Sequence, residues 1–299
     1  MKGLVSINGN VCKLEDAKIS VFDRGFLFGD SVFEVLTCFH GKIIKASRHM
    51  KRLAYSAEQI GLSLPWTEED LLDELQSLAN EVDAPKLYLR LIVTRGEGLP
   101  LLPADVPCNK VIFALPARRI PASHLREGVS LQTVSSSHSA RGPRVKASFY
   151  LPAIVAMKEA AKKGFSDILW VNPSGEVTEV STANIFFVRR EGDKVFVDTP
   201  KLHSGLLRGT TRDLIIGLLN KGGFHPHKSV IMKDQLKAYE EAFISSTVRG
   251  IYPVRQIDDL SFKSAEEGSV CRAVMNLYYD WVAEEVGFPV DWSTGKALK

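Results

Sequence analysis

The sequence predicts an α+β protein of two domains, and three observations support this assignment. The chain has 299 residues, which is more than one average domain needs. Stretches with the pattern of strands outnumber the helical stretches and do not alternate with them as a doubly wound sheet requires. Between residues 121 and 144 the composition turns to Ser, His, Arg, Gly and Pro. We therefore expect one α+β domain over residues 1–121, a linker over residues 122–134 and a second α+β domain over residues 135–299.

The first domain is expected to contain two helices. Residues 49–60 place apolar side chains on one helical face and end at Gly61, after a hairpin strand that leads to a helix cap at Ser47. Thr67 and Asp70 form a capping box, with Asp in place of the usual Glu, and open the second helix.

Two strands follow in this domain, at residues 86–94 and 110–116. The alternation of the first strand predicts one face with Leu87, Leu89, Leu91 and Val93, and an opposite face with Tyr88, Arg90, Ile92 and Thr94.

The second domain is expected to open with a helix. Within residues 145–165, Ile154, Met157 and Ala161 recur at helical spacing, and Gly164 ends the pattern. The later elements are strands at residues 167–172, 185–188, 195–197, 242–246 and 252–254, and a helix at residues 211–221.

Composition excludes several classes of function. Hydrophobic residues make up 45% and charged residues 24% of the chain, as in ordinary globular proteins. A formal net charge of +3 gives no support for nucleic-acid binding. No apolar run is long enough to span a membrane, and the N-terminal residues do not form a signal peptide.

The four cysteines are scattered, and the histidines do not cluster with them. We therefore expect reduced thiols, no metal site and a cytoplasmic protein.

Two short motifs could hold a phosphate group. Gly209, Thr210 and Thr211 open a helix, where free backbone N–H groups and the helix dipole suit an anion; an ordinary Thr N-cap is the alternative. Ser246 and Thr247 follow a strand, and their hydroxyls could bind phosphate or initiate a turn.

Three charged residues are further candidates. Lys146 precedes a helix beside apolar residues, which favours a neutral amine that can act as a Schiff-base nucleophile; a solvated lysine is the alternative. Glu179 lies in a strand-like stretch, where its carboxylate needs a partner unless the strand is an exposed edge. Arg52 lies on the expected helix of residues 49–60. It could be a phosphate ligand, or an ordinary solvated side chain.

The order of these residues resembles the fold-type IV pyridoxal-phosphate enzymes. This family contains the branched-chain and D-amino-acid aminotransferases and the aminodeoxychorismate lyases. The matching motifs are FDRGFLFGDSVFE, HMKRL, K-x-x-x-YL from Lys146, TE-x-S-x-x-NIF around Glu179, GLLRGTTR and ISST…PV. The match runs in the family's order from about residue 22 to residue 254, which makes it specific.

The resemblance implies a role for each candidate. Lys146 resembles the lysine that binds pyridoxal 5′-phosphate covalently and then moves a proton between substrate and cofactor. Glu179 resembles the acid that pairs with the pyridine nitrogen, and Tyr150 resembles the phenol that contacts O3′ of the cofactor. The implied phosphate ligands are Arg52, Thr210, Thr211, Ser246 and Thr247.

The resemblance also implies the architecture. We expect the two-domain fold of D-amino-acid aminotransferases, with a barrel-like second domain that carries the lysine, and a homodimer with active sites near its interface. One departure is Val180, where the family usually has glycine after the glutamate; its bulk could narrow the site.

The strand expected at residues 86–94 contains residues that bear on the choice of substrate. Tyr88 and Arg90 share a face and resemble the pair that helps to hold a carboxylate in branched-chain aminotransferases; an exposed strand face is the alternative. Phe28 and Phe33 match aromatic pocket positions that favour an apolar side chain, or they are core residues.

Thr94-Arg95-Gly96 resembles instead the D-amino-acid aminotransferases and the lyases. The Arg-x-His carboxylate trap of the D-specific enzymes and the Gly-Gly-Arg-Gly-Tyr continuation of the lyases are both absent from the following residues.

The sequence therefore supports a pyridoxal-phosphate transaminase, branched-chain-like, that moves an amino group from an apolar L-amino acid to a 2-oxo acid such as 2-oxoglutarate. One alternative is cleavage of aminodeoxychorismate to 4-aminobenzoate and pyruvate. Others are transamination of D-amino acids or (R)-amines, and a non-catalytic pyridoxal-phosphate-binding protein, against which Lys146 and Glu179 argue.

Overall fold

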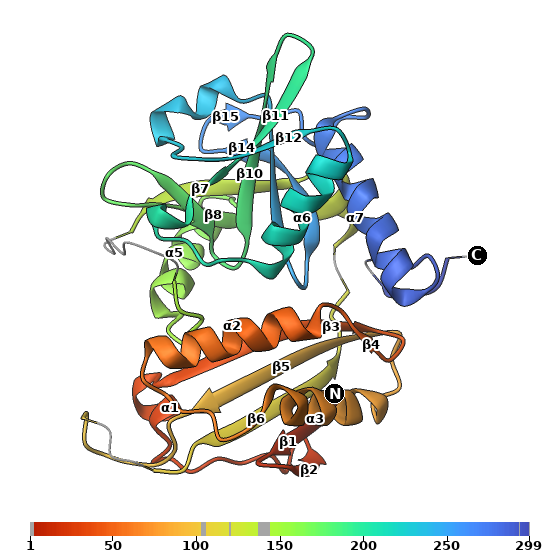
Figure 1. The fold of residues 1–299 in the computed structure, drawn as a ribbon. Coiled ribbons are helices and arrows are strands. Elements are labelled where there is room, and N and C mark those ends of the chain that lie inside the picture. Colours follow the sequence, from red (N-terminus) through yellow and green to blue (C-terminus); the bar gives the residue numbers. More distant parts are fainter. Residues whose placement is uncertain (1–2, 103–105, 120, 137–143, 293, 299) are drawn as a thin grey trace. The chain divides into compact units, whose positions relative to one another are not determined.

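The structure, a computed structural model, describes residues 3–102, 106–119, 121–136, 144–292 and 294–298 (Figure 1). The chain divides into two compact units. The first unit comprises residues 1–119, 145–149 and 285–299, and the second comprises residues 120–144 and 150–284. The chain therefore passes from one unit to the other four times.

An antiparallel sheet of six strands forms the centre of the first unit, in the order β2-β1-β6-β5-β3-β4. Its strands are β1 (Leu4–Ile7), β2 (Asn10–Lys13), β3 (Ser31–Phe39), β4 (Lys42–Ile43), β5 (Lys86–Thr94) and β6 (Asn109–Pro116). Its helices are α1 (Arg24–Phe28), α2 (Ala46–Gln59) and α3 (Glu68–Asn80).

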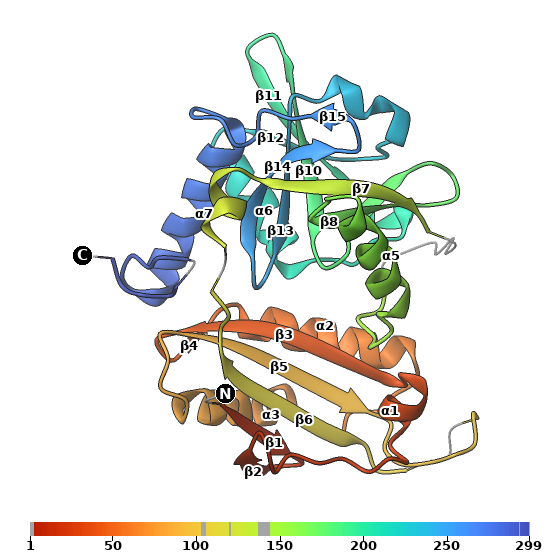
Figure 2. The ribbon, with the colours of Figure 1, turned by 180° about the vertical axis from the view of Figure 1, so that it is seen from behind.

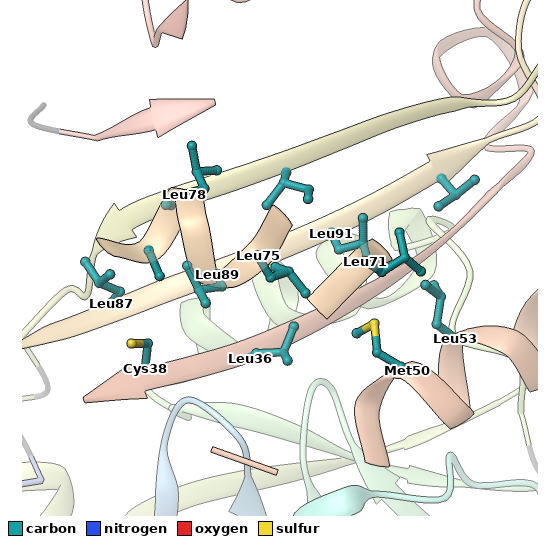
Figure 3. Packing of buried hydrophobic residues seen from close by; sticks show 14 of the residues in the cluster. Leu36, Cys38, Met50, Leu53, Leu71, Leu75, Leu78, Leu87, Leu89 and Leu91 are labelled. Atoms are coloured by element: carbon teal, nitrogen blue, oxygen red, sulfur yellow. The ribbon is translucent and has the colours of Figure 1, made fainter. Parts of the chain in front are cut away.

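The core of the first unit lies between one face of this sheet and the helices α2 and α3. Figure 3 shows side chains of both helices pointing toward the leucines of β5. Leu87, Leu89, Leu91 and Val93 are all buried, as their alternation predicts, while Tyr88, Arg90 and Ile92 on the other face are half-buried. Each buried leucine contributes roughly 2 kcal/mol to folding.

The predicted capping box at the start of α3 is confirmed. The Thr67 side chain accepts from the Asp70 N–H at 3.1 Å, and Asp70 accepts from the Thr67 N–H at 2.8 Å. The predicted cap of α2 at Ser47 is wrong, because the helix begins at Ala46 after Lys45, which has a left-handed backbone conformation. The Ser47 hydroxyl instead donates to Glu68.

The C-terminal residues 285–299 fold onto the first unit through Lys86. The Lys86 ammonium donates to the Trp292 C=O at 2.6 Å and lies 4.2 Å from the centre of the Trp292 ring. Burial lowers the pKa of Lys86 to about 7. His40 Nε2 lies 2.8 Å from the Gly295 C=O and gives the segment a second contact.

The second unit is built on a nine-stranded sheet with the order β12-β11-β10-β13-β14-β7-β8-β9, and β15 pairs with β14. Its strands are β7 (Val129–Ser135), β8 (Asp167–Val171), β9 (Val177–Val180), β10 (Asn184–Glu191), β11 (Lys194–Pro200), β12 (His225–Ser229), β13 (Glu241–Ser246), β14 (Gly250–Ile257) and β15 (Leu260–Ser261). Its helices are α4 (Ala122–Arg126), α5 (Leu151–Lys162), α6 (Thr210–Lys221) and α7 (Val270–Val286), with 3₁₀ turns at Leu202–Ser204 and Lys233–Ala238.

The two ends of this sheet meet. Glu176, just before β9, forms a bridge with Met232, which follows β12. The Val177 N–H donates to the Ile231 C=O at 2.8 Å. The sheet of the second unit is thus curled. Lys146, which the resemblance placed in the barrel-like second domain, lies instead in the segment 145–149 of the first unit.

Residues 122–134, expected as a linker, carry α4 and most of β7 instead. β7 lies between β14 and β8 and pairs with both in parallel (Figure 2). Two of its polar residues have partners beside the neighbouring strands: Ser130 contacts Ser166, just before β8, and Thr133 donates to Asp258, just after β14. The polar composition therefore belongs to a strand of the sheet, whose hydroxyls bond to residues distant in sequence, rather than to a linker.

Among the residues that the structure describes, no helix combines the length and the apolar character that crossing a membrane would require.

Candidate active site

Lys146 is held against β3 in the first unit. The Phe33 N–H donates to the Lys146 C=O at 3.0 Å, and Val32 bridges Ala147. The Lys146 N–H donates to the Ser56 hydroxyl on α2 at 3.3 Å. Its ammonium lies 4.5 Å from the centre of the Phe33 ring, a cation–π contact. The segment that carries the Lys146 amine is thus hydrogen-bonded to both β3 and α2.

Arg52 points to a buried carboxylate in the same unit. Its Nε lies 2.6 Å from Glu34 Oε1 and its Nη2 lies 2.7 Å from Glu34 Oε2. His49 Nδ1 lies 2.7 Å from the same Oε2. Burial alone would raise the pKa of Glu34, but the charge and hydrogen bonds of Arg52, together with His49, hold it at about 2. Arg52, predicted as a phosphate ligand, is therefore oriented by a carboxylate.

Glu34 and His49 had no predicted role. Glu34 is fully buried within β3, where most neighbours are apolar. Such a carboxylate requires a cationic partner, and His49 and Arg52 are three residues apart, on one face of α2. An acidic residue within an apolar strand, followed by two basic residues three positions apart on a helix, could have indicated this cluster from the sequence.

The face of β5 opposite the buried leucines carries Arg90 and Tyr88. The Arg90 guanidinium lies 4.2 Å from the centre of the Phe33 ring. Within the part of the chain that the structure describes, its buried Nε has no hydrogen-bond partner. A buried donor without an acceptor is costly, so this geometry suits an arginine that meets a ligand carboxylate.

Phe28 and Phe33 differ in their surroundings. Phe33 is buried in β3, and the cations of Lys146 and Arg90 both contact its ring. Phe28 ends α1, is 42% exposed, and has the Arg24 guanidinium 5.1 Å from its ring centre.

Glu179 in the second unit has partners for both of its oxygens. Its Oε2 accepts from the Leu207 N–H at 3.0 Å, and Arg144 Nη1 lies 3.7 Å from its Oε1. Neighbouring side chains of a strand point to opposite faces, so the buried Val180 side chain points away from Glu179 rather than beside it.

Thr210 and Thr211 form the first turn of α6, and both are buried. The N-cap is Gly209, which has no side chain to accept from the first N–H groups. This arrangement differs from an ordinary Thr N-cap and suits an anionic group at the helix N-terminus.

Ser246 ends β13, and Thr247 begins the turn to β14. The Ser246 hydroxyl accepts from the Arg249 N–H at 3.3 Å, so it also stabilises the turn. The Arg249 guanidinium donates to Asp167 at 2.7 Å and to Thr182 at 3.0 Å, which fixes the turn to the start of β8 and to the loop between β9 and β10. Tyr150 is half-buried and occupies the N-cap position of α5.

The predicted residues thus gather as two sets, one in each unit. In the first unit the structure brings together Lys146, Phe33 and Arg90 through ring contacts, with Arg52 on the helix that supports Lys146. In the second unit it joins Glu179 to the loop that leads into Thr210.

The donor chemistry fits pyridoxal phosphate. A carboxylate suits a pyridinium nitrogen, hydroxyls and a helix N-terminus suit a phosphate, and an amine suits an aldehyde. Two further buried hydroxyls, on Ser181 and Ser245, have no hydrogen-bond partner among the described residues. They lie in or next to the segments that carry Glu179 and Ser246.

The sequence profile of the family described as amino-transferase class IV matches residues 31–257. A putative branched-chain-amino-acid aminotransferase of Methanocaldococcus jannaschii is 29% identical over 92% of this chain and 95% of its own. A D-alanine aminotransferase of Listeria monocytogenes is also 29% identical, over 95% of this chain and 97% of its own.

Among solved structures, the branched-chain aminotransferase of the thermophilic archaeon Thermoproteus uzoniensis with norvaline is similar in fold. Its TM-score is 0.82 at 27% identity, over 95% of this chain and 95% of that one.

Proposed function

Because the chain belongs to the class IV aminotransferases, which are pyridoxal-phosphate enzymes, we propose that it transfers the amino group of an apolar, branched-chain-type L-amino acid to a 2-oxo acid such as 2-oxoglutarate. The substrate assignment rests on Arg90. Its buried Nε has no hydrogen-bond acceptor among the described residues. It supports a substrate or co-substrate carboxylate at β5, and the Phe33 ring beside it supports an apolar side chain.

Each proposed residue has a separate task. Lys146 supplies the amine that binds the cofactor and then carries the proton to and from the substrate Cα. Glu179 holds the proton on the pyridine nitrogen, and Tyr150 contacts the ring oxygen. The cofactor, when bound, supplies an electron sink for the negative charge at Cα.

The phosphate is assigned to Thr210, Thr211, Ser246 and Thr247, with Arg52 as its cationic partner. The buried first turn of α6 supports the two threonines, because its N–H groups lack a side-chain cap. The Glu34 carboxylate supports Arg52 by fixing the direction of its guanidinium.

A second candidate is transamination of a D-amino acid, which the 29% identity to the Listeria enzyme favours. Arg95, in the segment that resembles the D-specific enzymes, does not add support. Its guanidinium is bound to the Asp30 carboxylate and to the carbonyls of Ile60 and Gly61.

The test is the visible absorption of the purified holoenzyme during addition of L-leucine, D-alanine or (R)-1-phenylethylamine. We expect L-leucine to convert the cofactor to its amino form, and Lys146→Ala to abolish turnover. Conversion by D-alanine or the amine alone would contradict the L-specific assignment. A bound cofactor that no donor changes would favour the lyase.

A second experiment measures steady-state kinetics with 2-oxoglutarate as the amino-group acceptor. Arg90→Met is expected to raise the KM for 2-oxoglutarate by about tenfold or more and to change kcat less, because one charge-assisted contact is lost. Arg119→Met, at an exposed position of the same unit, is the matched control and should leave both constants unchanged.

We also propose a homodimer in a reducing, cytoplasmic compartment. The first unit exposes Phe26 at 67%, Leu101 at 77% and Leu102 at 85%. Arg24 donates to the carbonyls of Pro100 and Leu101, so α1 and the segment 98–102 form one apolar surface. A second copy of the chain is the proposed cover for this surface. The four cysteines are free, which supports the compartment.

A further inference from the structure

Leu207 is fixed through both of its peptide groups. Its N–H donates to Glu179 Oε2 at 3.0 Å, and its C=O accepts from Asn184 Nδ2 at 3.0 Å. Asn184 is the first residue of β10 and is only 5% exposed. A buried amide that donates to a backbone carbonyl restrains that peptide plane. Asn184 therefore holds in place the residue whose N–H meets the Glu179 carboxylate.

The oxygen of the same Asn184 side-chain amide explains why residue 209 is a glycine. A Cβ at Gly209 would lie 1.9 Å from Asn184 Oδ1. The backbone of Gly209, with φ −72° and ψ 131°, is one that any residue adopts. Glycine is required at this position by the Asn184 side chain and not by backbone conformation. The same amide thus packs on the N-cap of α6, immediately before Thr210.

We propose that Asn184 is a positioning residue, which sets the distance between the Glu179 carboxylate and the N-terminus of α6. The inference rests on the proposed function. Pyridoxal phosphate carries its pyridine nitrogen in a rigid ring and its phosphate on a short CH₂–O arm of the same ring. The protein groups that meet them must therefore keep a fixed spacing. Asn184 acts through Leu207 and Gly209.

The test is titration of the apoenzyme with pyridoxal phosphate, followed by quenching of protein fluorescence. Asn184→Ala and Gly209→Ala are each expected to raise the dissociation constant about tenfold, as for the loss of one hydrogen bond. The double variant should bind no more weakly than the weaker single variant, because both changes disrupt one contact.

Two matched controls lie on α6 itself. Asn220→Ala removes an exposed amide that donates to the Ile216 C=O. Gly217→Ala adds a Cβ into open space. Both should leave the dissociation constant unchanged. If Asn184→Ala fails to fold, the nearly isosteric Asn184→Asp removes the same donor and should give the same weakening.

A spectroscopic readout separates positioning from general stability. Once saturated with cofactor, Asn184→Ala should show a shifted visible band with an altered pH dependence, because Glu179 has lost its fixed partner. Unchanged affinity, a wild-type spectrum or additive effects of the two substitutions would overturn the inference. Failure of the wild-type protein to bind the cofactor would overturn the proposed function instead.

Discussion

At the scale of single residues, Glu34 controls the side chain proposed to meet the phosphate. Its carboxylate is fully buried and is bound by Arg52 through two hydrogen bonds. Burial lowers the pKa of His49 despite the nearby carboxylate, so at neutral pH His49 faces Glu34 as an uncharged N–H donor. The cluster is therefore a single ion pair with an auxiliary donor.

The lowered pKa of Glu34 gives a pH prediction with a definite sign. The folded protein binds this proton less tightly than the unfolded chain does. The stabilisation is therefore complete above the ordinary pKa of 4.5 and is lost as the pH falls toward about 2. A shift of that size corresponds to about 3 kcal/mol of unfolding free energy.

Urea unfolding of the apoprotein between pH 6 and about 2 measures this contribution. Glu34→Gln should be less stable than the wild type at pH 6, since Arg52 then lacks its counter-charge. The difference should shrink as the pH falls. A difference that is independent of pH would contradict the assignment.

At the scale of elements, the structure shows which sequence patterns were decisive. The alternating leucines of β5 and the capping box of α3 were predictable, because each pattern is local. β7 was not, since its partners β14 and β8 come from later in the chain and its hydroxyls are satisfied only there. Lys146, Glu179 and the threonines of α6 were proposed from the order of motifs, whereas Glu34 and Asn184 became candidates only through side-chain contacts that the fold creates.

The capping box gives a prediction for α3. Thr67→Ala removes the hydroxyl that accepts from the Asp70 N–H and should destabilise the protein by about 1 kcal/mol. The measurement is the urea midpoint at pH 7 with an unchanged m-value. Ser77→Ala, at an exposed position inside the same helix, is the control and should be neutral or slightly stabilising. An equal loss in both variants would refute the capping role.

At the scale of the whole molecule, the apolar surface of α1 and residues 98–102 predicts self-association. Light scattering after size-exclusion chromatography should give twice the chain mass of 33.1 kDa at micromolar concentration. Phe26→Glu, which places a charge at a 67% exposed apolar position, should shift the protein toward monomer.

Val11→Glu is the control for this experiment, because Val11 lies on the edge strand β2 rather than on the apolar surface. It should leave the mass unchanged. A wild-type protein that is monomeric at all accessible concentrations would remove the support for a homodimer.

The return of residues 285–299 to the first unit has a consequence for synthesis on the ribosome. β5 is translated early, yet Lys86 contacts Trp292, which comes 206 residues later in the chain. The segment 145–149, which carries Lys146, also arrives after the sheet on which it packs. During synthesis the first unit therefore lacks both contacts until these later segments have been made.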